Sequence, residues 1–303
     1  MAVIGLLTVL LLSWAAPARP AQSTAVFVTA SFLDKNRLYL ENLSREEIHV
    51  FENGKPREVE FLASKEVPVA YGLLWDRDLL PKPFDDPRAG QYGIPSATAA
   101  TNAAYQLLDR ALGRHVGWVA SYDSEFRLAI DFTQDTGLIK DAIQQLRGER
   151  LMEEPTLYGA LFTAVKKLSQ RNEKRRVLIV FLDYLDFQTS GKLKPLKNLL
   201  SASNVELFIA SFAASKIASS HGLPPLQSEA SLRELAGVTA GGAFFSMLDG
   251  IEGMGRRISY QVASYYTVGF QAESPPDQPA KLKIDCTRPG TKVITHPVVP
   301  ILQ

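Results

Sequence analysis

Acidic and hydroxyl side chains at three points of the chain could together bind a divalent cation. Asp76 and Asp78 follow a long apolar run, and Asp183 follows a second one. Thr156 stands near the start of a helical stripe that lies between the two runs. Ligands of open α/β sheets bind at the carboxyl ends of the strands, so we expect these side chains to converge there. Carboxylate and hydroxyl oxygens suit a hard cation such as Mg²⁺.

Other chemistries find little support in the sequence. No nucleophile elbow, phosphate loop or dinucleotide-binding motif is present. The single cysteine, Cys286, excludes an internal disulfide and any zinc site built from cysteines, and its alternation with apolar neighbours predicts a buried strand position. The chain has four histidines, His49, His115, His221 and His296. Their spacing does not match that of a metal site.

The composition indicates a globular protein without affinity for nucleic acid. The 303 residues include 33 Lys and Arg against 32 Asp and Glu, which leaves a net charge of +1. This balance gives no electrostatic case for a nucleic-acid partner. The hydrophobic content of 46% is too high for a disordered chain.

The first 21 residues are predicted to be a signal peptide. Val3–Ala16 is an uncharged apolar run, and the Ala16-Pro17-Ala18 sequence that follows resembles a signal-peptidase site. The run is shorter than the roughly 18 apolar residues of a membrane span, so no span is expected. This interpretation places the mature protein outside the cytoplasm, secreted or periplasmic. A buried first strand or helix is the alternative.

The middle of the chain is predicted to form an α/β domain. Continuous apolar runs at Val67–Leu74, Val177–Leu182 and Val205–Phe212 are typical of parallel strands that are buried on both faces. Helical stripes at Ala100–Ala111 and Leu157–Leu168 alternate with them. The further elements predicted are a strand pair at His115–Tyr122 and Phe126–Phe132 and a final helix at Ile251–Val262.

Strand-like segments flank this α/β region on both sides. Asn53-Gly54 lies between alternating apolar residues and predicts a type I′ hairpin that reaches Phe61. Leu282 and Ile284 alternate in a strand near the other end. We therefore expect a small β-domain built from both chain ends, with the α/β domain inserted in it. The predicted boundaries are 22–65 for the N-terminal half of the β-domain, 66–260 for the α/β domain and 261–303 for the C-terminal strands.

The order of these elements resembles the von Willebrand factor A domain and its metal-ion-dependent adhesion site. The shared features are a hydrophobic strand that ends in Asp, a helix that opens with Thr156-Leu157-Tyr158, and a second hydrophobic strand that ends in Asp. Segments similar to the secreted, acidobacterial-type von Willebrand factor A-related proteins are Leu43–Pro56, Ser121–Glu125, Asp131–Thr133, Tyr265–Phe270 and Thr287–Val293. The resemblance implies a doubly wound, mainly parallel α/β sheet.

The resemblance also implies a metal site, which is altered here. The family motif is Asp-x-Ser-x-Ser, whereas residues 76–80 read Asp-Arg-Asp-Leu-Leu. Asp76, Thr156 and Asp183 match family ligand positions, and Asp78 and Leu80 replace the two serines. The implied ion is Mg²⁺, or Mn²⁺ or Ca²⁺ in its place, and no other cofactor is expected. Leu80 cannot bind a metal, and the extra carboxylate would largely neutralise one. The favoured interpretation is a degenerate site without an ion.

Two functions of different class fit these residues. The leading hypothesis is an exported, non-catalytic module that binds an unknown protein or cell-surface ligand at the carboxyl edge of the sheet. The long loop Leu79–Pro95 at that edge is either part of the binding surface or an ordinary insertion. The alternative is an enzyme, because Asp76-x-Asp78 also resembles the haloacid-dehalogenase-like phosphatases. There Asp76 would be the nucleophile, Asp78 the acid/base, and Mg²⁺ would neutralise the phosphate.

Overall fold

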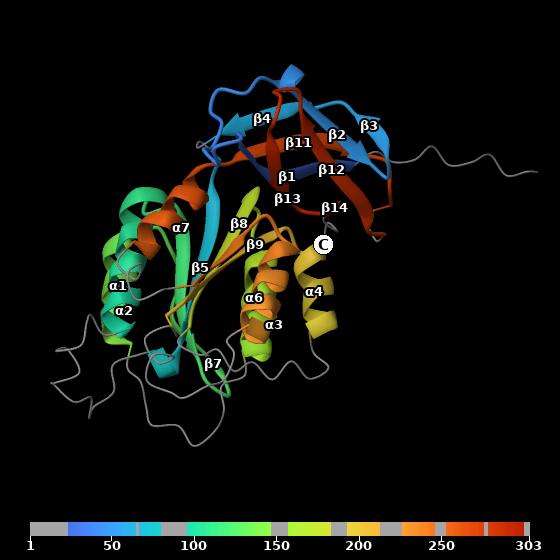
Figure 1. Cartoon of the computed structure of the whole chain (residues 1–303). Coiled ribbons are helices and arrows are strands. Elements are labelled where there is room, and N and C mark those ends of the chain that lie inside the picture. The colour runs from blue at the N-terminus through green and yellow to red at the C-terminus, as the bar shows by residue number, and fades with distance from the viewer. Residues whose placement is uncertain are drawn as a thin grey trace, which may run out of the picture.

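The computed structural model describes residues 24–64, 67–79, 96–146, 157–182, 193–212, 226–245, 253–275 and 278–299. The expected signal peptide, the loop beyond Leu79, Thr156, Asp183 and His221 lie outside these ranges, as does the side chain of Asp78. The described part consists of two structural units, an α/β unit and a β-sandwich (Figure 1). In the described ranges, none of the helices has the length and apolar content that a membrane crossing requires.

A six-stranded sheet with the order β10-β9-β8-β5-β6-β7 forms the centre of the α/β unit. Its strands are β5 (Val69–Asp76), β6 (Val116–Tyr122), β7 (Phe126–Thr133), β8 (Arg175–Leu182), β9 (Val205–Ser211) and β10 (Gly242–Phe245). All pairs are parallel except β6 with β7, which is antiparallel. Every residue of β5 is buried, as expected for a strand covered on both faces. The predicted doubly wound α/β fold is confirmed.

Helices cover both faces of this sheet (Figure 1). One face packs against α1 (Ser96–Leu107), its π-helical continuation Leu108–Leu112, α2 (Thr136–Gln145) and α7 (Met254–Ala263). The other packs against α3 (Leu157–Ser169), α4 (Leu193–Ala202) and α6 (Leu226–Gly237). The apolar stripes predicted for α1 and α3 lie in these two clusters. Four further elements, α2, α4, α6 and β10, were not expected from the sequence.

Two glycines allow large aromatic rings to pack across the sheet. Gly72 of β5 lies beside Trp118 of β6, and Gly117 of β6 lies beside Tyr71 of β5. A Cβ atom on Gly72 would stand 2.2 Å from Cζ2 of Trp118. Both rings are buried completely, so neither can move aside without disturbing the core.

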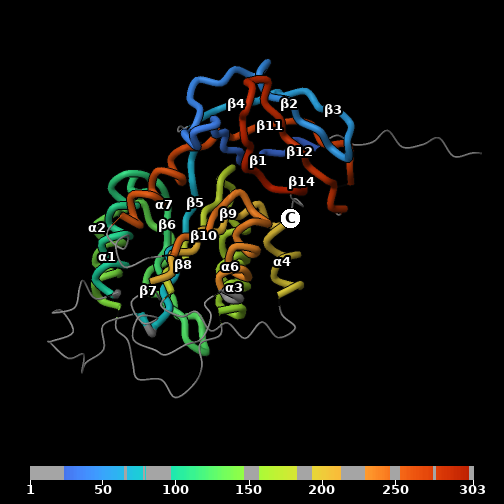
Figure 2. The backbone as a smooth tube through the Cα atoms, viewed as in Figure 1, coloured from blue at the N-terminus to red at the C-terminus, as the bar shows by residue number. Residues whose placement is uncertain are grey.

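The β-sandwich is built from both ends of the described chain. Figure 2 shows its N-terminal strands interleaved with its C-terminal ones. One sheet has the order β13-β1-β11-β4, with β1 (Thr24–Leu33), β4 (Phe61–Ser64), β11 (Tyr266–Ala272) and β13 (Lys292–Thr295). The other has the order β14-β12-β2-β3, with β2 (Ile48–Glu52), β3 (Lys55–Arg57), β12 (Ala280–Cys286) and β14 (Val298–Val299). Phe32, Val50, Phe270 and Ile284 lie in the core that the two sheets share.

The predicted hairpin is present, but its second strand is shorter than expected. Asn53 and Gly54 have positive φ angles of 50° and 80°, which a type I′ turn requires. The strand after the turn ends at Arg57, and Phe61–Ser64 pairs with β11 in the other sheet instead. Cys286 is the last residue of β12, where it is only partly buried, so the prediction of a buried cysteine was wrong. The end of a strand is less covered than its middle.

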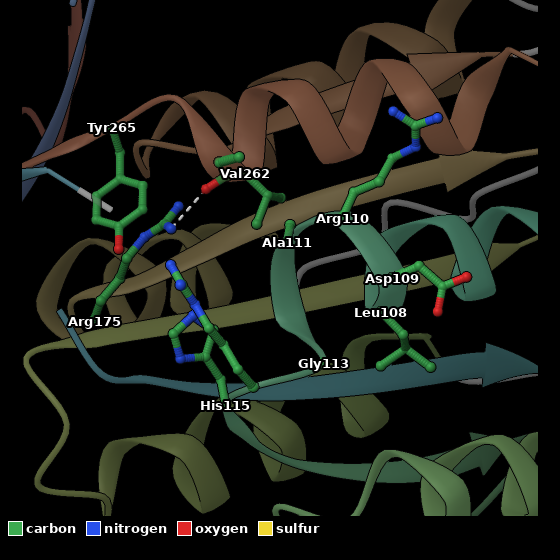
Figure 3. Close-up of a pocket in the computed structure, with 11 residues that line it drawn as sticks. Leu108, Asp109, Arg110, Ala111, Gly113, His115, Arg175, Val262 and Tyr265 are labelled. Carbon is green, nitrogen blue, oxygen red and sulfur yellow. Dashed lines mark hydrogen bonds between the residues drawn. The ribbon is translucent and has the colours of Figure 1, made fainter. Parts of the chain in front are cut away.

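A buried ion pair lies where the two units meet, at the amino ends of the parallel strands. Arg175 of β8 binds Glu206 of β9 through Nε and Nη2, and both distances are 2.7 Å. Its Nη1 donates to the carbonyl oxygen of Val262 at 2.7 Å, and its guanidinium lies 3.6 Å from the centre of the Tyr265 ring (Figure 3). Because both partners are buried, removing one of them would leave an uncompensated charge in the interior.

His296 follows β13 and is also buried completely. Neither of its ring nitrogens has a hydrogen-bond partner among the described residues. Burial lowers the pKa of His296 to about 4, and the charge of Glu206 opposes this shift only in part. The imidazole is therefore neutral in the folded protein at neutral pH.

Candidate functional site

The carboxyl edge of the parallel sheet faces away from the β-sandwich (Figure 1). At this edge Asp76 ends β5 opposite Tyr122 of β6, and Leu182 of β8 stands opposite Ser211 of β9. The carboxylate-bearing Asp76 is only 1% exposed. The sandwich contacts the other end of the sheet, as in the hydrogen bond from Asn204 Nδ2 to the carbonyl oxygen of Phe27 at 3.0 Å. Among the described residues, the β-sandwich therefore leaves the carboxyl edge uncovered.

A charge network lies at this edge directly after β5 and β6. Arg77 is 5% exposed, and its Nη1 donates to Oδ2 of Asp123 at 2.9 Å. Arg127 of β7 approaches the same oxygen through Nη1 at 3.1 Å. The other oxygen, Oδ1, accepts the backbone N–H of Glu125 at 2.8 Å. Two arginines and a backbone amide thus balance the buried carboxylate of Asp123.

Stacked aromatic rings lie near the same ends of the strands. Trp75 stacks on Phe181 with ring centres 4.4 Å apart and an angle of 18° between the planes. Phe181 in turn stacks on Phe212, with centres 6.5 Å apart. These rings come from the second-to-last residues of β5 and β8 and from the residue after β9. They hold the ends of three strands in fixed positions, so the edge is a rigid platform.

The proposed metal ligands are only partly within the described residues. Asp76 ends its strand at the predicted place, whereas the side chain of Asp78, Thr156 and Asp183 lie outside. Thr156 directly precedes α3, which begins at Leu157. Among the described residues, no group of three or more His, Cys, Asp or Glu side chains could hold an ion. The four-residue ligand set therefore stays a prediction.

The sequence led us to expect no role for Arg77, and Asp123 was noted only within Ser121–Glu125, a segment similar to one in the von Willebrand factor A-related proteins. A signal was present, because Arg77 follows the last residue of one apolar strand and Asp123 follows the last residue of its neighbour. Parallel register places Asp76 opposite Tyr122, so the next residues of the two strands meet as well. Opposite charges at that position predict a pair at the edge.

Comparison with solved structures identifies the fold. The structure of proximal thread matrix protein 1 from the mussel byssus, with a zinc-occupied MIDAS motif, aligns with a TM-score of 0.50 and 12% identity. The alignment covers 68% of this chain and 48% of the mussel protein. The chain has a von Willebrand factor A-like fold. The chain thus spans about half the length of the mussel protein.

Two bacterial structures are also similar to this von Willebrand factor A-like chain. A von Willebrand factor type A protein from Catenulispora acidiphila has 11% identity and a TM-score of 0.49, and the alignment covers 92% of this chain and 74% of that one. An aerotolerance-related membrane protein from Bacteroides fragilis has 15% identity and a TM-score of 0.47, with 64% and 98% covered. No protein-family model matches the sequence, and no curated protein does. At such low identity the likeness concerns the fold alone.

Proposed function

We propose that this protein is a non-catalytic interaction module that binds a protein or cell-surface partner through the carboxyl edge of its sheet. The observation that carries the proposal is the Arg77–Asp123–Arg127 network, which places paired charges beside stacked aromatic rings at an edge that the described residues of the β-sandwich leave uncovered. Exposed side chains border it, since the side chain of Glu125 is 73% exposed and that of Arg127 is 44% exposed. Rigid charged surfaces favour specific and rapid association. The predicted signal peptide places this activity outside the cytoplasm.

We further propose that binding at this edge needs no metal ion. In a metal-dependent adhesion site a divalent cation supplies the positive charge that attracts a partner's carboxylate. Here a buried guanidinium follows Asp76 directly in the chain and is held by Asp123. This guanidinium already occupies the carboxylate of Asp123, and a fixed cation at this point repels a second one. Leu80 removes one of the family's ligand positions as well.

The burial of Asp76 supports binding rather than catalysis. A phosphatase of the alternative class needs the carboxylate of Asp76 to reach the phosphorus atom of its substrate. At 1% exposure the side chain offers no such approach. We expect no Mg²⁺-dependent hydrolysis of a generic aryl phosphate. Turnover that Asp76→Asn abolishes would overturn the proposal.

Site-specific photo-crosslinking in the native cell tests the proposed binding face. A benzophenone amino acid at Glu125 lies on the edge, and one at Lys35 on the exposed surface of the β-sandwich is the control. The proposal predicts a discrete adduct from position 125, none from position 35, and loss of the adduct in a variant that also carries Arg77→Met. Equal adducts at both positions, or none at position 125, would refute it.

A further inference from the structure

Two adjoining cavities lie far from the carboxyl edge, between α7 and the π-helical turn. The first has a volume of about 390 Å³, and its floor includes Arg175 and Tyr265 (Figure 3). The second has a volume of about 530 Å³ and lies along α7. Arg110 and Ala263 line both, so the two cavities adjoin and are described together as one groove. We call it the arginine groove, and its defining residues are Arg110, Arg256, Arg257, Tyr260 and Ala263.

The groove carries positive charge that the described residues leave unneutralised. Arg110, Arg256 and Arg257 are exposed, and none forms an ion pair with a described residue. Asp109 lines the first cavity, but its carboxylate is held by Lys140 at 2.8 Å. Arg175 in the floor is already neutralised by Glu206. The three outer arginines therefore present their charge to solvent or to a ligand.

The position of two arginines in the first turn of α7 strengthens this charge. Helix N-termini carry partial positive charge and ordinarily attract acidic side chains. The first turn of α7 contains none, and the N-cap residue Gly253 provides no side-chain hydrogen bond. Arg256 and Arg257 thus add to the positive end of the helix. An anionic partner relieves the repulsion between these charges.

The shape of the groove favours an extended chain over a compact anion. Arg256 and Arg257 are consecutive in α7, so their side chains leave the helix about 100° apart and spread the charge along the groove. Figure 3 shows Arg110 extending toward α7 from the opposite wall. Tyr260 is 52% exposed and packs edge-on against Tyr39, with ring centres 5.1 Å apart. The groove therefore offers separated charges beside an immobilised aromatic surface.

We propose that the arginine groove binds an extended acidic segment of a protein partner. Guanidinium groups match carboxylates in a bidentate geometry, and each arginine takes one Asp or Glu side chain of the segment. An apolar residue of the segment packs on the ring of Tyr260. This surface is separate from the carboxyl edge, because Arg175 and Tyr265 in its floor belong to the amino ends of the strands.

A labelled peptide of repeating Glu-Glu-Leu units serves as the probe, with fluorescence anisotropy as the readout at low and physiological salt. The variant R110E/R256E/R257E reverses the groove, and K35E/K55E/K281E makes the same change in net charge on the exposed β-sandwich surface. The groove variant is expected to bind the peptide about tenfold or more weakly, whereas the control variant stays within about twofold. Tyr260→Ala is expected to weaken binding as well.

Three results would overturn the proposal. Equal loss in both charge-reversed variants would mean attraction by net charge alone. Equal binding of a Gln-Gln-Leu peptide would mean that the carboxylates play no part. Failure of the wild-type protein to bind the peptide, while it binds heparin or anionic vesicles through the same arginines, would assign the groove to another class of partner. Thermal unfolding of each variant checks that the exposed substitutions leave the fold intact.

Discussion

Replacing Glu206 with leucine is expected to destabilise the protein by about 3–5 kcal/mol, because it leaves a buried charge without its partner. Arg175 and Glu206 are each 2% exposed, so water cannot replace the lost carboxylate. The variant removes two hydrogen bonds of 2.7 Å to Oε1 and Oε2 and leaves the guanidinium with the carbonyl oxygen of Val262 and the ring of Tyr265.

The double variant Arg175→Met/Glu206→Leu removes both charges. It therefore separates the destabilisation caused by one unpaired buried charge from the net contribution of the ion pair to the free energy of unfolding. Apolar residues of similar volume often replace a buried ion pair with little net change, so the double variant is expected to lie within about 2 kcal/mol of the wild type. The matched control is Glu234→Leu, which removes an exposed glutamate that pairs with Lys197. Exposed pairs of this kind contribute about 0.2–1 kcal/mol.

Urea unfolding followed by far-ultraviolet circular dichroism measures all three free energies. The reasoning predicts a large loss for Glu206→Leu, substantial recovery in the double variant and almost no change for Glu234→Leu. A loss below about 1 kcal/mol for Glu206→Leu would refute the assignment of a fully desolvated pair. So would a double variant that is as unstable as the single one.

Three further predictions follow from buried groups. The pKa of His296 is about 4 in the folded protein and 6.5 ordinarily, so the unfolded chain takes up the proton first as the pH falls. The free energy of unfolding is therefore expected to decrease by about 3 kcal/mol between about pH 6.5 and pH 4. His296→Met should flatten that part of the pH profile in urea unfolding, and an unchanged profile would contradict the prediction. Gly72→Ala places a Cβ atom 2.2 Å from the Trp118 ring and is expected to cost about 1–3 kcal/mol, seen as a lower thermal midpoint and altered tryptophan emission. Asp123→Asn is expected to cost about 3 kcal/mol in urea unfolding, because Arg77 loses its buried counter-charge, whereas the exposed control Glu125→Gln should be neutral.

The fold was largely predictable because its strongest elements have strong patterns. The continuous apolar run Val177–Leu182 covers all of β8 except its first two residues, and the helical stripe Leu157–Leu168 covers all of α3 except Ser169. The missed elements are short or weakly apolar. β10 has four residues that are each only partly buried, and it depends on β9 for its pairing. α2 had a visible start signal, since Asp135 caps it by accepting from the N–H groups of Gly137 and Leu138.

The pairing partners of strands were harder to predict than the strands themselves. Val59 and Phe61 continue the alternation of the predicted hairpin, yet Phe61–Ser64 pairs with β11, about 200 residues further along the chain. The charge network at the carboxyl edge was hard to predict for the same reason, because it depends on which strands pair. Arg77 and Asp123 are 46 residues apart, and only the register of two parallel strands brings them together. Local patterns do not contain that information.

The central claim is that the carboxyl edge binds its partner without a divalent ion, because arginine side chains already pair with its buried carboxylate. Thermal unfolding of the mature chain in chelator and in millimolar Mg²⁺, Mn²⁺ or Ca²⁺ tests it most directly. An ion present at about 50 times its Kd stabilises by roughly 2.3 kcal/mol, which raises the midpoint by several degrees. The account predicts the same midpoint in chelator and in all three ions. A selective rise with one ion that Asp183→Ala abolishes would contradict it.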